Sequence, residues 1–250
     1  MPTLGEEHEA AAGTSRRTLW FALALLAAIL LGLCLSFGPS HLPALASARP
    51  GTLGRTYPTA GVTTVDLDGF SGNIIVTATA TTGISDIVQA GNGQSAADVL
   101  DTYDSATHTL RLYCAISGGC AASDYTVTVP EHVGFILRQI SGQAQLSGLS
   151  GPVSVTATSA NTTFTGLATS SFTAVITSGQ LNATFAAVPG RVAVSVVSAS
   201  ASVYLPGAAQ YAVAQHVDSG NVNVQVPQNP SSANTVDTTV TSGQISLMTS

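Results

Sequence analysis

The chain of 250 residues carries little charge, with Asp, Glu, Lys and Arg making up 8% of it against about 25% in typical globular proteins. It has no lysine, and its seven basic residues are arginines that form no cluster larger than the pair Arg16 and Arg17. Nucleic-acid binding needs concentrated cations, so this composition and a net charge of −6 argue against it. Low charge also argues against a disordered chain, which needs repulsion and hydration to stay open.

Carboxylates are missing from the whole central stretch, residues 132–217. Coil-shaped polysaccharide enzymes and calcium-binding repeats need carboxylates on several neighbouring turns. No G-x-S-x-G motif and no glycine-rich phosphate loop before a helix occurs either. The densest acidic patch is Asp98, Asp101 and Asp104 with His108 nearby, and solvated loop carboxylates explain it better than a catalytic or cation site. The sequence therefore predicts no catalytic residue, no cofactor and no metal site.

Cysteine is scarce, with Cys34 in an apolar run and Cys114 and Cys120 close together further on. Outside the cytoplasm such a close pair indicates a local disulfide. The alternative, a zinc site, needs four ligands, and neither a histidine nor a third cysteine lies nearby in the sequence. We therefore favour a disulfide between Cys114 and Cys120 over a metal site.

One long apolar run is present, "TLWFALALLAAILLGLCLSFGPS" at residues 18–40, and it contains no charge. At ~1.5 Å per residue it is long enough to cross a ~30 Å hydrocarbon core. Arg16 and Arg17 precede it and the next basic residue is Arg49, which places the N-terminus in the cytoplasm. The alternative is a signal peptide cleaved near the small residues 46–48, but these lie far beyond the apolar run.

These features predict a single-pass protein of the cell membrane. We expect a short cytoplasmic tail at residues 1–17, a transmembrane signal anchor at 18–38, and a Pro/Gly-rich stalk at 39–60. An extracellular β-repeat domain would then occupy residues 61–250. This domain has no helical pattern, because no stretch past residue 40 keeps apolar residues at a spacing of three and four over ten positions.

A short motif, Ser-Gly followed by Gln or Asn, recurs through this domain. Its serines, including two units with Ala in place of Gly, are spaced by 18, 19, 20, 21 and 23 residues. We interpret the motif as the corner of a stacked repeat, because Ser and Gly favour tight turns. The predicted corner residues are Ser141, Gly142, Gln143, Ser159, Asn161, Ser178, Gly179, Gln180, Ser219, Gly220, Asn221, Ser242, Gly243 and Gln244.

Aligning the units on that serine gives columns that alternate between apolar and polar. The positions six before, three after and five after are apolar in nearly every unit, whereas those two and four after are polar. A period of two is the mark of a half-buried strand, and a fixed repeat near 20 residues indicates a coil. The prediction is an all-β fold, a β-solenoid (β-helix-like) repeat whose Gln and Asn side chains stack and hydrogen-bond along the axis. The upstream stretch "VDLDGFSGNIIVTA" fits the same template, except that Ile75 breaks the alternation.

The chain resembles the DUF4097 family of β-repeat proteins of bacterial envelopes. The residues that carry the resemblance are "YTVTVPEHVGFILRQISGQAQLSGLSGPVSVTATSANTTFTGL" and the later "TSGQLNATF", "DSGNVNVQV" and "TSGQISL". The resemblance covers roughly residues 61–250. It implies a β-solenoid-like fold, an adhesin label that is itself inferred, and no catalytic residues to carry over.

We therefore expect a non-catalytic adhesin or structural interaction module on the cell surface. Its outward Thr, Ser, Asn and Gln side chains suit a cell-envelope polymer or another protein as partner, and the C-terminal strand, as an edge, would allow self-association. Two alternatives rank lower. One is an enzyme that acts on envelope glycans through the upstream loops, and the other is ice or lattice binding by Thr pairs, which occur in only two of six units.

Overall fold

The computed structural model describes residues 52–57, 59–89, 98–115 and 120–250. The chain divides into two compact units, Met1–Ser47 and Ala48–Ser250, and all the described residues belong to the second. The expected tail at 1–17 and anchor at 18–38 lie outside the described residues, as does most of the expected stalk. Among the residues that the structure describes, no helix is long and apolar enough to cross a membrane.

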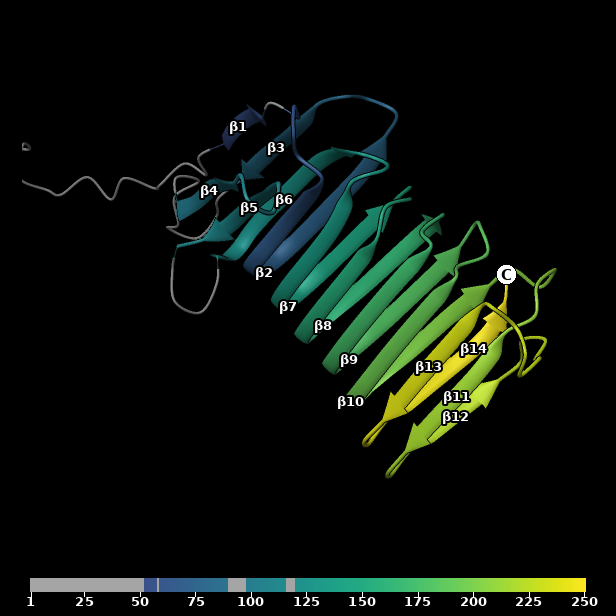
Figure 1. Ribbon diagram of the computed structural model, residues 1–250. Helices are drawn as coiled ribbons and strands as arrows, with labels where there is room; N and C mark the ends of the chain where they lie inside the picture. The colour runs from purple at the N-terminus through teal and green to yellow at the C-terminus, as the bar shows by residue number, and fades with distance from the viewer. Residues whose placement is uncertain (1–51, 58, 90–97, 116–119) are drawn as a thin grey trace, which may run out of the picture. The chain divides into compact units, whose positions relative to one another are not determined.

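The described residues form one 14-stranded sheet (Figure 1). This confirms the all-β prediction for that part of the chain. The strands, in chain order, are β1 (Thr52–Tyr57), β2 (Thr64–Thr79), β3 (Ile84–Gln89), β4 (Val99–Asp104), β5 (Thr109–Cys114), β6 (Cys120–Pro130), β7 (Gly134–Ser147), β8 (Val153–Leu167), β9 (Ser171–Phe185), β10 (Arg191–Leu205), β11 (Ala212–Val217), β12 (Asn221–Val224), β13 (Thr235–Val240) and β14 (Gln244–Thr249).

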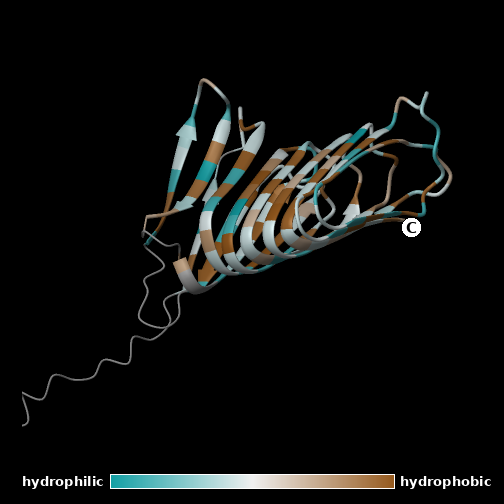
Figure 2. Ribbon diagram, turned by 90° about the horizontal axis from the view of Figure 1, so that it is seen from below, coloured by the Kyte–Doolittle hydropathy of each residue, from teal (hydrophilic) through white to brown (hydrophobic). Residues whose placement is uncertain are grey.

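Each long strand consists of two legs joined at the Ser-Gly corner. In β9 the buried residues of the first leg are Phe172, Ala174 and Ile176, and those of the second leg are Leu181, Ala183 and Phe185. The alternation shifts by one residue at the corner, so both legs direct their apolar side chains into the same interior. Figure 2 shows the resulting alternation of hydrophobic and hydrophilic bands along the strands.

Equivalent residues of successive units pair in parallel, as the alignment of the repeat predicts. Ser141 pairs with Ser159, Ser159 with Ser178, and Ser178 with Ser198, each in register. The columns expected inside are buried from β7 to β10, among them Phe135, Val153, Phe172 and Val192. These residues belong to one continuous hydrophobic core, which includes edge-to-face contacts of Phe172 with Phe164 and Phe185. The stacking prediction is confirmed for these units.

The order of units at the C-terminal end differs from the sequence order that we expected. Strands β13 and β14 lie between β10 and the pair β11–β12, which forms the end of the stack (Figure 1). The C-terminal strand is therefore not an edge, and that expectation is wrong: β11 and β12 are the edge strands at this end of the sheet. Side-chain chemistry explains why β13 rather than β11 lies next to β10. The two strands differ at one equivalent inward position, which is Thr238 in β13 and Gln215 in β11. Thr238 is buried with its hydroxyl bonded to the carbonyl of Ala214, whereas Gln215 is exposed.

The N-terminal end of the stack is covered by antiparallel strands. β1 pairs with β3, and β3 pairs with β6, which lies on the outer side of β2. Residues 52–57 were expected to belong to the stalk, so the boundary placed at residue 61 is too late. Their alternation explains the difference, since Leu53 and Tyr57 pack against the core. Solenoid ends need such covering because their last core residues have no neighbouring unit.

Two buried threonines with opposite hydrogen bonding give a test of this core. Thr162 is 1% exposed and its hydroxyl has no hydrogen-bond partner among the described residues, so Thr162→Val should raise the free energy of unfolding by about 1 kcal/mol. Thr169 is 0% exposed, and its hydroxyl donates to the Ser171 carbonyl and accepts from the Ser171 amide. Thr169→Val should therefore lower stability by about 1–2 kcal/mol. Urea unfolding of both variants checks the signs, and two losses of equal size would contradict this reading.

Candidate functional site

The outer face of the second legs from β2 to β12 carries uncharged polar side chains at every position of two columns except Ile75, and we call it the polar face. Two columns form it. The first runs through Asn73, Gln143, Asn161, Gln180, Ser200, Gln244 and Asn221, which pair in register from strand to strand. The second begins at Ile75 and continues through Gln145, Thr163, Asn182, Ser202, Ser246 and Asn223. At a strand spacing of about 4.8 Å, this is a regular array of hydrogen-bonding groups.

The amides of the polar face do not bond to one another as we expected. No hydrogen bond joins the side chains of Gln143, Asn161 and Gln180, although these residues are paired neighbours. They are exposed, and water satisfies exposed amides at little cost, so no internal ladder is required. Their donors and acceptors are therefore available to a ligand.

Corner glycines explain how adjacent units approach so closely. Gly142 and Gly179 have φ angles of 95° and 113°, and a Cβ on either would collide with the backbone of the unit beneath. Ala160 and Ala199, in the intervening units, bury their methyl groups instead. From β7 to β10 the corners are thus of two types, and Gly and Ala alternate at this position.

Charged residues gather on the first-leg face at the N-terminal end, where they neutralise each other. Arg138 donates to both carboxylate oxygens of Asp66 at 2.8 and 2.7 Å, and Arg111 pairs with Asp68. These residues lie on the adjacent strands β5, β2 and β7. The arrangement is a cross-strand ion-pair ladder, which gives stability and register but leaves no base free for chemistry.

A buried polar cluster links the strands that cover the N-terminal end. The Asp86 side chain is 0% exposed and accepts hydrogen bonds from Arg55 at 2.6 Å and from the Tyr125 hydroxyl at 2.8 Å. Arg55 also donates to the Val99 carbonyl and to Asp101. The cluster therefore ties β1, β3, β4 and β6 together. Sequence reasoning missed it, although Asp86 stands between Ile84 and Val88 at an inward position, where a carboxylate needs a partner.

Burial and the Asp86 carboxylate raise the pKa values of Tyr57 and Tyr125 well above the ordinary tyrosine value. Folding therefore favours the neutral phenol of each tyrosine over its phenolate. Stability is therefore full below the unfolded pKa of about 10 and falls as the pH rises above it, by up to about 1.4 kcal/mol per pH unit for each tyrosine. We expect urea midpoints to drop between pH 10 and 11.5, with a shallower slope for Tyr125→Phe. An unchanged slope in that variant would contradict the assignment.

The acidic patch considered as an enzyme site does not form one. Asp101 bonds to Arg55, whereas Asp104 accepts hydrogen bonds from the Ala106 amide and the Thr107 hydroxyl within its own turn. His108 contacts the Tyr103 hydroxyl through Nδ1 at 3.2 Å. Within the described residues no group of three or more His, Cys, Asp or Glu side chains could hold a metal ion. The structure does not bring Asp101 and His108 together.

The expected cysteine pair is joined, with the Cα atoms of Cys114 and Cys120 5.6 Å apart. The disulfide connects the end of β5 to the start of β6, which are the two legs of one unit, and Cys120 pairs with Phe70 of β2. It therefore occupies a corner position, where the other units carry Ser-Gly.

The threonine pairs considered for lattice binding do not stack. Thr156 pairs with Arg138 and Val175, and Thr239 pairs with Ser195 and His216. The structure thus places no matching Thr pair beside either of them.

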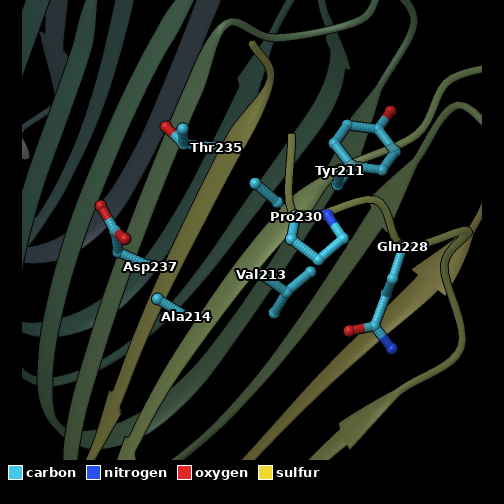
Figure 3. A pocket seen from close by; sticks show the side chains of 8 residues that line it. Tyr211, Val213, Ala214, Gln228, Pro230, Thr235 and Asp237 are labelled. Atoms are coloured by element: carbon cyan, nitrogen blue, oxygen red, sulfur yellow. The ribbon is translucent and has the colours of Figure 1, made fainter. Parts of the chain in front are cut away.

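A pocket of about 320 Å³ lies beside the edge strand β11 (Figure 3). Its lining includes Tyr211, Val213 and Pro230, together with Asp237, which forms an ion pair with Arg191 at 3.1 Å. The Tyr211 hydroxyl donates to the Pro206 carbonyl. This pocket offers an apolar surface next to a free strand edge and no acid–base pair.

A family model described as Toastrack DUF4097 matches residues 121–248. The structure of a "putative cell adhesion protein" from Clostridium sporogenes ATCC 15579 has 11% identity and a TM-score of 0.49, over 80% of this chain and 100% of that one. A "putative adhesin" from Bacteroides fragilis NCTC 9343 has 11% identity and a TM-score of 0.40, over 79% and 97%. At such values these two likenesses carry no argument about function. No curated protein matches.

Proposed function

We propose, from the premise that this chain belongs to the Toastrack DUF4097 family, that it is a non-catalytic adhesive module of the bacterial cell surface. In this proposal the apolar run at 18–38 anchors the chain, residues 1–17 stay in the cytoplasm, and the β-repeat unit faces the exterior. Its partner is a cell-envelope polymer or protein, which binds to the polar face.

The observation that carries the proposal is the polar face itself. Its amide side chains are exposed, its hydroxyl side chains are exposed or half-buried, and these uncharged groups lie in register across seven strands. The side chains of Gln143, Asn161 and Gln180 form no hydrogen bonds with one another. Uncharged hydrogen-bonding groups at fixed spacing suit a partner that also repeats. Exposed amide side chains that bond only to water add little to folding stability, so stability alone does not account for their repetition on this face.

The edge strands supply a second contact surface for the same role. In a parallel ladder alternate residues point their backbone groups to either side, so every second residue of β11 and β12 leaves its N–H and C=O groups toward the free edge. The inward residues of this last unit, Val213, Val222 and Val224, are only half-buried. A partner's strand could pair here, and self-association of two chains would use this edge rather than β14.

The test compares bacteria that display the full chain with bacteria that lack it, on surfaces coated with purified envelope polysaccharide or envelope protein. The variant Asn161→Arg with Ser200→Arg places two charges on the polar face. The matched control, Thr158→Arg with Val197→Arg, places the same charges on the first legs of the same strands. We expect cells that display the chain to adhere to one of these surfaces. Adherence should be lost in Asn161→Arg with Ser200→Arg and retained in Thr158→Arg with Val197→Arg. Equal adherence with and without the chain would refute the proposal, and protease treatment of intact cells checks that the repeat unit is exposed.

A further inference from the structure

A hollow of about 420 Å³ opens at the N-terminal end of the polar face, where four neighbouring strands meet. Its side chains form two rows across β3, β6, β2 and β7. One row contains Gln89, Asp124, Asn73 and Gln143, which pair in that order. The next row contains Thr126, Ile75 and Gln145, and Ile87 extends it on β3.

Two exceptions to the chemistry of the polar face coincide in this hollow. Ile75 is 46% exposed in a column that carries polar side chains in the other units. Asp124 is the one charged residue on the outer face of the second legs, within the residues that the structure describes. Ile75 and Ile87 together form an exposed apolar surface beside the polar side chains of this hollow. An apolar surface bordered by a few polar groups is typical of a ligand-binding groove.

The two rows offer complementary chemistry. Asn73 donates from Nδ2 to Asp124 Oδ1 at 2.9 Å, which orients the carboxylate, and no described residue directs a donor at Oδ2. The exposed amides of Gln89, Gln143 and Gln145 add donors and acceptors on either side. Ile75 and Ile87, both 46% exposed, supply apolar surface in the second row, two residues away from Asn73 and Gln89 on the same strands. A ligand that fits has hydroxyl groups along one edge and C–H groups on its face.

We propose that this hollow binds a sugar unit of a neutral polysaccharide whose chain runs across β3, β6, β2 and β7. A pyranose ring has the required hydroxyl edge and C–H face, and its hydroxyls donate to Asp124. Anionic sugars are disfavoured, because Asp124 and the net charge of −6 repel them. A lone carboxylate cannot cleave the bound chain, since glycoside hydrolysis uses a pair. This inference rests on the proposed adhesive function and names the ligand class.

The experiment measures binding of neutral gluco-oligosaccharides of one to six units to the full chain in lipid nanodiscs, since sugar-headed detergents would compete. Ile75→Gln gives the hollow the side chain that its column carries in the next unit, and Asp124→Asn removes the charge. Matched controls are Ile140→Gln, an exposed isoleucine outside the hollow, and Asp218→Asn, an exposed aspartate of the last unit. An oligo-uronic acid serves as the anionic arm.

The proposal expects affinity to grow with chain length, to fall about tenfold in Ile75→Gln and in Asp124→Asn, and to stay unchanged in both controls. Circular dichroism shows whether each variant is folded, and both substituted residues are at the surface. A different outcome is oligosaccharide binding that is unchanged in Ile75→Gln and Asp124→Asn but lost in Asn161→Arg with Ser200→Arg. That result would refute binding in the hollow and would still support the adhesive function of the polar face. Preference for the uronic acid overturns the ligand class. Binding by no oligosaccharide, with adherence to envelope protein retained, also overturns the hollow alone.

Discussion

Asp86→Ala is expected to lower the free energy of unfolding of the unit Ala48–Ser250 by about 4 kcal/mol, the largest effect of any single substitution considered. The Asp86 side chain is 0% exposed, whereas that of Arg55 is 18% exposed. Removing the carboxylate leaves the guanidinium short of its main partner and takes the acceptor from the buried Tyr125 hydroxyl. Both losses fall on groups that cannot recover full hydration.

The matched control is Asp237→Ala, because Asp237 and Arg191 also form a cross-strand ion pair, at 3.1 Å. These side chains are 46% and 63% exposed, so their loss should cost under about 1 kcal/mol. Urea unfolding gives the two free energies. Hydrogen exchange should show that β1 and β3 lose protection first in Asp86→Ala, since solenoid units contact only their neighbours. Similar costs for the two substitutions would show that the buried cluster does not hold the N-terminal end.

Gly179→Ala is expected to cost about 3 kcal/mol, from two causes that act together. The φ angle of 113° is unfavourable for alanine, which accounts for about 1–2 kcal/mol. The added methyl group would also collide with the carbonyl oxygen of Ala160 in the next unit, and backbone cannot move aside as a flexible side chain can. The collision should force β8 and β9 apart at the corner.

Gly166→Ala separates the two causes. Gly166 has a φ of 66°, and apart from Gly166 itself and its two neighbours in the chain, no described residue has an atom within 4 Å of where the added Cβ would be. We expect a loss of about 1 kcal/mol there, from backbone strain alone. Thermal or urea unfolding of both variants provides the comparison. If they lose the same stability, close stacking at the corner is not what requires glycine at position 179.

The inward columns show what could be read from the sequence. Phe135, Phe172 and Val192 were assigned to the interior from a period of two and a repeat of about 20 residues, and all three are buried in the expected register. The local alternation of apolar and polar residues was sufficient for this assignment, because every unit repeats the same pattern. An ambiguous residue in one unit can be assigned from the equivalent residues of the others. The disulfide between Cys114 and Cys120 could also be predicted from the sequence, because the two residues are only six positions apart.

The features around the ends of the stack could not be read in this way. Arg55 and Asp86 are 31 residues apart in a stretch without a clear repeat, and only the pairing of β1 with β3 brings them into contact. Ile75 was visible as a break in the pattern, but Asp124 joins it only because β6 lies beside β2. The candidate hollow therefore needed the tertiary structure, whereas the polar columns beside it did not.

By itself the sequence determined the two-legged strand, the residues that face inward, and the polar outer columns, because hydrophobic alternation fixes which face of a strand is buried. Only the tertiary structure decided the order of units: β13–β14 sit inside β11–β12, and β5–β6 sit outside β2. Every unit carries nearly the same inward pattern, so each could pair with several others. The choice depends on small differences such as Thr238 against Gln215, which act only once the units are packed together.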